Sequence, residues 1–206
     1  MTGKTAVRDV GPKQMSLKGL LRDIRACTLC QAALPLGARP VVQAAATARL
    51  LIVGQAPGRK VHETGVAWND ASGDRLRDWL QIEPSTFYDA ARVAIVPMGF
   101  CYPGAADSGG DRPPRPECAP RWHASLLGHL GDISCTLLVG QYAQRHYLRS
   151  ARKQTMTETV RTFADYGPQF FPLPHPSWRS VPWMRQNRWF EARVLPKLRE
   201  VVRALV

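Results

Sequence analysis

The sequence predicts an α/β protein of three layers, α/β/α, in which helices cover both faces of a central, mostly parallel four-stranded sheet. Short apolar segments alternate along the chain with longer segments whose apolar residues recur at helical spacing. This alternation is typical of parallel strands joined by helical crossovers. The 206 residues are enough for one compact domain with a sizeable core, and we expect residues 15–206 to form it.

The first elements follow from local patterns. From Ser16, the sequence SLKGLLRDIRAC has apolar residues at helical spacing, and serine is a favoured N-cap. Residues 48–53, ARLLIV, form a short apolar run that predicts a buried strand. Residues 72–82 indicate a helix, with Ser72 as its N-cap and Asp74 in its first turn.

The rest of the chain alternates in the same way. Residues 92–100 indicate a second strand, which Pro97 is expected to end. A proline- and glycine-rich loop over 101–120 is too long for a simple connection, which suggests a functional segment or a metal anchor. The remaining expected elements are helix 121–130, strand 135–140, helix 141–148, strand 169–174 and a closing helix 187–205. Pro196 is expected to kink this closing helix.

The composition favours an anionic partner. The formal net charge is +12, and most basic side chains are arginines, which suit bidentate phosphate contacts. We therefore expect nucleic acid to bind, with a solvated basic surface as the alternative. The sequence shows neither a secretory signal nor an apolar span that could cross a membrane, so a cytoplasmic location is expected. No motif indicates an obligate protein partner, and the polar residues 1–14 are expected to be a flexible N-terminal end.

A ligand site is expected at one edge of the predicted sheet, because parallel sheets bind ligands beyond the carboxyl ends of their strands. The loops at these ends carry GQAPG (54–58), PMGFC (97–101), GQYAQ (140–144) and HPS (175–177). Glycines in the first loop allow the backbone to approach a ligand closely, and its proline stiffens the turn. Each loop alone is a weak signal, and their expected convergence is a stronger one.

Four cysteines form two pairs that are typical of a metal site. Cys27 and Cys30 stand in CTLC, and sixteen residues separate Cys101 from Cys118. Four thiolates suit a [4Fe–4S] cluster or a four-cysteine zinc site, and the residues alone do not choose between them. Unligated core thiols are the other interpretation. Cys135 lies in an expected strand and is interpreted as a core residue.

In the order and spacing of these motifs, the chain resembles the uracil-DNA glycosylase superfamily. The resemblance is closest to its iron–sulfur branch (family 4, with some features of family 5). That branch begins G-E-A-P-G, continues E-D-x-x-G-x-P-F-V-G-x-A-G and closes with H-P-S. The residues in register are Gly54, Ala56, Pro57, Gly58, Gly65, Gly73 and His175. Trp68 stands at the aromatic position that, in the family, stacks on the extruded base. The resemblance implies a structural [4Fe–4S] cluster at the four cysteines, with zinc as the alternative.

The sequence departs from the family at three places. Gln55 replaces the glutamate, so an amide would orient the water without accepting its proton. Pro97 replaces the asparagine that reads uracil, which leaves the backbone of Met98, Gly99 and Phe100, or the side chain of Asn69, as candidate readers. The E-D pair is absent, and the candidate general bases are His62 and Asp70, followed by Glu63. A solvated loop group is the alternative for all three.

The segment after H-P-S is expected to contact DNA. Ser177, Trp178 and Arg179 stand where the family's loop enters the minor groove, so that an aromatic ring would fill the vacated base stack. The alternative is that Trp178 or Trp183 packs on the closing helix. The basic segment 144–154 either lines the DNA path or is a solvated helix face.

The resemblance implies a DNA-repair glycosylase that hydrolyses the N-glycosidic bond of uracil in DNA and leaves an abasic site. In this interpretation residues 54–58 shape the pocket, Gln55 holds the water, Trp68 stacks on the base and His175 stabilises the leaving anion. One alternative is excision of another deaminated base, hypoxanthine or xanthine, because the reading asparagine is missing. The other is a covalent DNA binder without turnover, in which His62 captures DNA.

Overall fold

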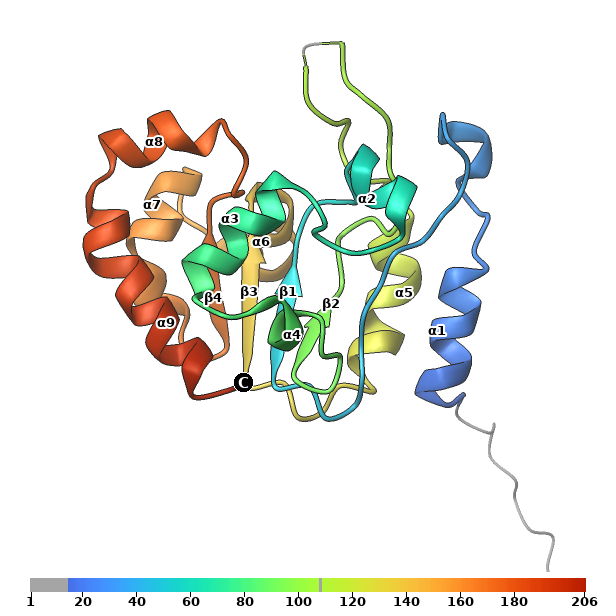
Figure 1. Ribbon diagram of the computed structural model, residues 1–206, viewed down its shortest axis with the longest axis horizontal. Coiled ribbons are helices and arrows are strands. Elements are labelled where there is room, and N and C mark those ends of the chain that lie inside the picture. Colours follow the sequence, from blue (N-terminus) through green and yellow to red (C-terminus); the bar gives the residue numbers. More distant parts are fainter. Residues whose placement is uncertain (1–14, 108) are drawn as a thin grey trace, which may run out of the picture.

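The computed structural model describes residues 15–107 and 109–206, and the expectation for residues 1–14 falls outside this part of the chain. Four strands form one sheet in the order β2-β1-β3-β4, and each neighbouring pair is parallel. The strands are β1 (Leu50–Val53), β2 (Val93–Ile95), β3 (Cys135–Val139) and β4 (Phe170–Leu173). The predicted four-stranded parallel sheet is therefore confirmed, and its strands lie at the centre of the molecule (Figure 1).

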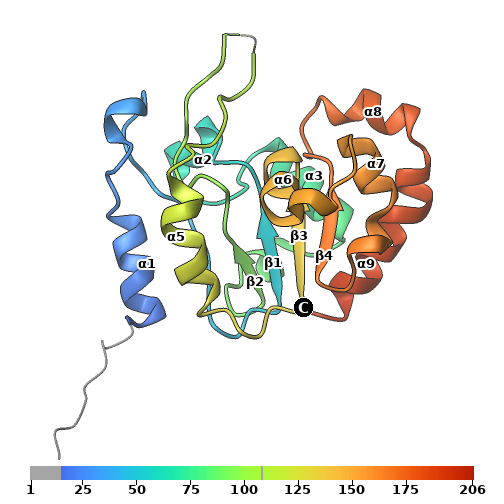
Figure 2. The ribbon, with the colours of Figure 1, turned by 180° about the vertical axis from the view of Figure 1, so that it is seen from behind.

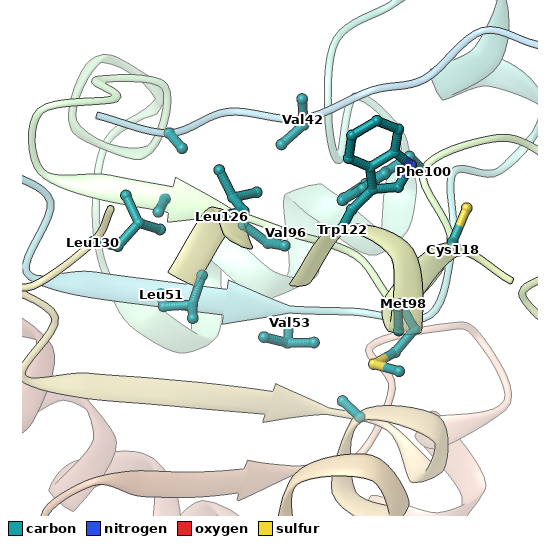
Figure 3. Packing of buried hydrophobic residues seen from close by; sticks show 14 of the residues in the cluster. Val42, Leu51, Val53, Val96, Met98, Phe100, Cys118, Trp122, Leu126 and Leu130 are labelled. Atoms are coloured by element: carbon teal, nitrogen blue, oxygen red, sulfur yellow. The ribbon is translucent and has the colours of Figure 1, made fainter. Parts of the chain in front are cut away.

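Helices cover both faces of the sheet and bury its alternating side chains (Figures 1 and 2). Leu51 and Val53 point into a cluster with α1 (Leu17–Arg25), α5 (Cys118–Leu127) and α6 (Gln141–Leu148), part of which Figure 3 shows. Leu50 and Ile52 point into a second cluster with α3 (Ala71–Leu80) and α9 (Leu195–Arg203). The period of two along each strand thus divides the core into two halves and confirms the three-layer α/β/α class.

The helix ends agree with the predictions in part. Ser16 caps α1, and its Oγ accepts a hydrogen bond of 3.2 Å from the amide of Gly19. The cap of α3 is Asp70 and not Ser72, because Oδ1 of Asp70 accepts the amide of Gly73 at 2.8 Å. Asp74 lies in the first turn of α3, as predicted.

Three other bounds differ from expectation. Within the expected segment 92–100, strand β2 ends at Ile95, two residues before Pro97, which was expected to end it, and the following segment bonds to the β1 loop. Helix α5 begins at Cys118, three residues early. The closing helix has a π-helical segment (Phe190–Val194, η4) before α9, and Pro196, which cannot donate to the preceding turn, lies where the π pattern gives way to α.

Several short elements were not predicted: α2 (Arg59–Thr64), α4 (Pro84–Phe87), α7 (Met156–Arg161), α8 (Ser180–Gln186) and the 3-10 turns Gln31–Ala33, Arg149–Ala151 and Phe163–Tyr166. Each spans at most seven residues, which is too short for a clear helical period. Two of them, α2 and α8, begin directly after the loops that leave β1 and β4, so they help to place the loops at the carboxyl edge of the sheet.

Candidate active site

A cavity of about 390 Å³ lies at the carboxyl edge of the sheet, between the loops that leave β1, β2 and β4. The predicted residues that line it are Gly54, Gln55, Ala56, Pro57, Gly58, Trp68, Asp70, His175, Ser177, Trp178 and Arg179. Five other predicted residues lie outside its lining: His62, Asn69, Met98, Gly99 and Phe100. The expected convergence of GQAPG with HPS is therefore present in the structure, as the general rule for parallel sheets requires.

Two glycines fix the indole of Trp68 in this cavity. A Cβ on Gly54 would lie 2.7 Å from Cζ2 of Trp68, so only a glycine lets the ring approach the β1 loop. A Cβ on Gly73 would lie 1.7 Å from the carbonyl oxygen of Trp68, which excludes any side chain there. The backbone of Trp68 is left-handed, with φ of 55°, a conformation that costs a bulky residue energy and must be held by its surroundings.

His175 stands against Trp68, with ring centroids 5.6 Å apart and planes tilted by 33°. Its loop is held by Arg75, whose guanidinium donates to the carbonyl of Pro176 at 3.0 Å. Burial lowers the pKa of His175, and the nearby charge of Asp70 opposes this shift. The imidazole is therefore neutral near pH 7, a form that can donate one hydrogen bond to a ligand in the cavity.

Two carboxylates face the same point of the cavity wall. Oδ2 of Asp70 lies 3.5 Å from the position of a Cβ on Gly58, and Oδ2 of Asp111 lies 3.6 Å from it. Burial, followed by the charge of Asp70, raises the pKa of Asp111, while Arg179 opposes the rise. The other oxygen of Asp70 caps α3, which fixes the direction of its carboxylate. Together these two groups can hold a water molecule and accept its proton.

Asp111 is a cavity residue that the sequence did not reveal. The segment after β2 folds back on itself through an antiparallel bridge between Ala105 and Asp111 and a bond from the amide of Arg112 to the carbonyl of Gly104. This segment projects above the carboxyl edge of the sheet (Figure 1). The available signal was an acidic residue in a long loop expected to be functional, which did not specify the residue.

Gln55 lines the cavity, and its side chain is tied to the same segment. The side-chain Nε2 donates to the carbonyl of Arg112 at 3.2 Å, and the backbone carbonyl of Gln55 accepts the amide of Gly99 at 3.0 Å. One N–H of the side-chain amide is thereby occupied, and its Oε1 is left to accept a hydrogen bond from water. Gln55 can orient a water molecule in this arrangement but cannot take its proton.

On the β2 side of the cavity, three backbone polar groups are bonded within the protein. The carbonyl of Pro97 accepts a bond of 3.0 Å from Nε2 of His123, whose Nδ1 accepts the hydroxyl of Tyr147 at 2.8 Å. The amides of Met98 and Gly99 donate to the carbonyls of the β1 loop. Pro97 therefore lines the cavity with its ring alone.

Residues 98–100, the expected backbone readers of the base, lie outside the cavity lining and form bonds within the protein. The amides of Met98 and Gly99 are already used, and the carbonyl of Phe100 accepts the amide of Val41 at 2.8 Å. Asn69 also lies outside the cavity lining, where the chain turns from Trp68 to the cap of α3.

Comparison with known families decides the relationship of the chain. A model described as the uracil DNA glycosylase superfamily matches residues 41–199, which is more than half of the sequence. The chain belongs to the uracil-DNA glycosylase superfamily. Membership implies a DNA glycosylase, a hydrolase that acts on DNA and serves DNA repair. The match does not specify the iron–sulfur branch, and Cys27 and Cys30 precede the matched region.

His62 does not reach the cavity of this glycosylase. Helix α2 turns Val61 and His62 inward, and His62 is only 8% exposed, with its ring 6.1 Å from that of Tyr102. Glu63 lies on the outer side of the helix, where Arg59 pairs with it at 2.9 Å. Of the three candidate bases, only Asp70 lines the cavity.

The segment after H-P-S presents one tryptophan to solvent and buries the other. Trp178 is 72% exposed at the rim of the cavity, with the guanidinium of Arg179 5.3 Å from its ring centroid. Trp183 packs against Trp189 and Phe190 and donates to Thr157 at 2.8 Å. The packing alternative is therefore correct for Trp183, whereas Trp178 remains available to DNA.

The four cysteines of the predicted metal site come together in space, although the two pairs are far apart in the sequence. Cys27, Cys30, Cys101 and Cys118 line one small cavity beside Phe100 and Trp122. Burial raises the pKa of Cys101 to about 11, and the charges of the other three thiolates add to this rise. The donor set thus fits a thiolate-bound group.

The four thiols line this cavity without being drawn together around one ion. Zinc at about 2.3 Å from each sulfur would draw at least three donors around one point. Within the described residues, no group of three or more His, Cys, Asp or Glu side chains is placed to hold a metal ion. Cys135 is buried in β3 and separate from this cluster, as predicted for a core residue.

No helix within residues 15–107 and 109–206 has the length and apolar character needed to span a membrane.

Proposed function

We propose that this glycosylase removes uracil from DNA by hydrolysing the N-glycosidic bond, which leaves an abasic site. The observation that carries the proposal is the meeting of His175 and Trp68 in one cavity, 5.6 Å between ring centroids, with the Asp70 carboxylate in the same lining. These groups match the three needs of the reaction: a face for the extruded base, a donor for its oxygen and a site for water.

The leaving base is stabilised first. As the C1′–N1 bond breaks, its electron pair goes to the base and positive charge develops on the sugar. Trp68 stacks on the ring of the base, and neutral His175 donates a hydrogen bond to the base oxygen that becomes negative. Because burial lowers the pKa of His175, the donor meets the developing anion without a full positive charge that must be buried.

Water then attacks the sugar. Gln55 accepts one hydrogen bond from it, and the carboxylates that face Gly58 hold the other side. Asp70 takes the proton as the water oxygen bonds to C1′. Asp111 is the second holder of this water, and burial, followed by the charge of Asp70, raises the pKa of its carboxyl.

Extrusion of the base is assigned to the exposed segment after H-P-S. Trp178 presents an exposed aromatic ring at the rim of the cavity and fills the vacated stack, and Arg179 contacts a phosphate. Extrusion costs a few kcal/mol, which such contacts offset.

The proposed cofactor is a structural [4Fe–4S] cluster held by Cys27, Cys30, Cys101 and Cys118, with a four-cysteine zinc site as the alternative. Such a cluster would join the N-terminal helix to the segment after β2 and supply no step of the reaction. Iron and acid-labile sulfide in stoichiometric amounts, with a brown colour, support the cluster. Zinc in their place supports the alternative.

A second candidate substrate is another deaminated base, hypoxanthine or xanthine. It is favoured by the β2 wall, where Pro97 replaces the reading asparagine and the carbonyl of Pro97 and the amides of Met98 and Gly99 are already bonded within the protein. Covalent capture by His62 is not favoured, because this side chain is buried outside the cavity.

The deciding experiment incubates the protein with oligonucleotides that contain one uracil, in a single strand, opposite guanine and opposite adenine, followed by alkali. Strand cleavage is expected for at least one substrate, and His175→Ala should reduce its rate by about 10²- to 10³-fold. Oligonucleotides with hypoxanthine and xanthine test the second candidate in the same assay. Intact strands with all three uracil substrates would refute uracil excision.

A further inference from the structure

A second groove, of about 500 Å³, lies beside the active-site cavity. Its walls are the proline-containing segment 114–116, the start of α5 and the first turns of α6. Met98 forms part of its apolar surface, and Tyr142, Arg145 and His146 come from α6. Arg145 and His146, at the start of the basic segment 144–154, line this groove, whereas no residue of that segment lines the active-site cavity.

One segment of chain separates the groove from the cavity. Pro97 lines the cavity, and the next residue, Met98, lines the groove. The wall is stiff, because Gly99 is packed so closely that a Cβ there would lie 3.0 Å from Cβ of Pro114. A polymer with one unit in the cavity therefore has its neighbouring units within reach of the groove.

The chemistry of the groove suits a base together with a phosphate. Tyr142 is partly exposed and Arg145 is exposed, so a flat ring and a cation lie one helical turn apart. The lining contains no carboxylate among the described residues, and Arg145 forms no ion pair with that part of the chain. Within this lining, Arg115 is the cation that is already paired, with Glu117.

We propose that this groove binds the single-stranded DNA next to the nucleotide that occupies the cavity. One unstacked base lies on Tyr142, and a phosphate lies on Arg145. A single strand is favoured over a duplex because a stacking ring in a groove needs a base that is free of its partner and neighbours. The placement next to an extruded nucleotide rests on the proposed function, whereas the binding of a single strand does not.

The test measures fluorescence anisotropy with a labelled single-stranded DNA that contains no uracil, so that binding is observed without any reaction. Tyr142→Ala should weaken binding roughly 5- to 100-fold, the effect of losing one base–aromatic stack, while Tyr142→Phe keeps the ring and the affinity. Arg145→Gln should weaken binding and reduce the slope of log affinity against log salt by about 0.7, since one phosphate contact is lost.

Arg203→Gln is the matched control, because it removes the same charge from the end of α9, near the C-terminus and away from the groove (Figure 1). Its affinity and salt slope should change less than those of Arg145→Gln. Equal effects of the two arginine variants, or an unchanged affinity of Tyr142→Ala, would overturn the proposal. Circular dichroism of Tyr142→Ala and Tyr142→Phe establishes that both variants are folded.

A second readout separates this inference from the proposed function. Uracil excision should depend on Tyr142 in a long single strand and lose this dependence in an oligonucleotide too short to reach the groove. If no uracil substrate is cleaved but Tyr142→Ala still weakens binding, the proposed function fails and the single-strand site stands. If uracil is excised and Tyr142→Ala behaves as the parent in both assays, the groove proposal fails alone.

Discussion

The two sides of the active-site cavity differ in where their polar groups are directed. On one side, Asp70 and His175 from the segments after β1 and β4, together with Asp111, which reaches over from the folded-back segment after β2, keep polar atoms toward the cavity. On the side of β2, the carbonyl of Pro97 and the amide of Met98 are bonded inside the protein. The first side can therefore form hydrogen bonds with a substrate and exchange protons with it. The second side contributes the shape of the cavity wall. Substitutions on the first side should change kcat, and those on the second should change KM.

The largest effect is expected for Asp70→Asn. Asparagine is as good an N-cap as aspartate, so the cap of α3 is kept while the proton acceptor is lost. We expect kcat for uracil excision to fall by about 10²- to 10⁴-fold with KM little changed. Single-turnover kinetics with a uracil-containing oligonucleotide measures this loss.

The pH profile of this variant provides a further check. The charge of Asp70 raises the pKa of His175 against the lowering effect of burial, so removing the charge lowers this pKa further. The acid limb caused by protonation of His175 should then move to lower pH in Asp70→Asn. A normal kcat in this variant would show that water attacks without help from Asp70.

His123 anchors the β2 side through its bond to the carbonyl of Pro97, and we expect it to make the stability of the fold depend on pH. Burial lowers the pKa of His123 to about 4 from an ordinary 6.5. Between these values the unfolded chain binds a proton that the folded protein does not, so stability falls as pH decreases from 6.5 toward 4. The loss from this group is about 3 kcal/mol, from about 1.4 kcal/mol per unit of pKa.

His123→Phe keeps an aromatic ring beside Phe100 but removes the titrating group and the bond to Pro97. The variant should be less stable than the parent at pH 7. The difference in the free energy of unfolding should narrow toward about pH 4, because the parent loses the contribution of His123 there and phenylalanine does not titrate. Urea unfolding of both proteins at several pH values measures the gap. A constant gap would mean that His123 does not titrate in this range.

The sequence was sufficient for the sheet, because four short apolar runs separated by helical segments allow few arrangements. It also placed residues 54–58 and His175 together, since both follow strands of one parallel sheet. The bounds of α6 were predicted to the residue, because the glycine before it and the apolar spacing within it are local signals.

The positions that were not foreseen share one physical cause, which is that their determinants are distant in sequence. Asp111 reaches the cavity only because its segment folds back, and the amides of Met98 and Gly99 are used by carbonyls more than forty residues earlier. The inward position of His62 was not foreseen, because α2 is six residues long, too short for its inward face to be visible as a period.

Gly58→Ala tests the active side by adding a single methyl group. The new Cβ would lie 3.5 Å from Oδ2 of Asp70 and 3.6 Å from Oδ2 of Asp111, which is ordinary contact, and the φ of −78° suits alanine. The protein should fold normally, but the methyl group occupies the space of the water between the carboxylates. We expect kcat to fall by about 10- to 100-fold, part of the general-base contribution.

The melting temperature of Gly58→Ala provides the control for this effect. If melting is unchanged and kcat falls, the loss is local to the water site. An unchanged kcat would place the attacking water elsewhere, for example on Gln55 alone.

Pro97→Ala should have the smallest effect and a different kinetic signature. The carbonyl that His123 holds is kept, and the methylenes of the proline ring are removed from the cavity wall. Loss of such apolar contact costs about tenfold in kcat/KM, and it should appear as a higher KM at constant kcat, because the wall does not contact the reacting atoms. The loss should be similar for uracil and hypoxanthine, since the wall offers neither base a hydrogen bond. A fall in kcat, or a loss confined to one base, would show that the β2 side takes part in recognition, and the contrast between the two sides would then be wrong.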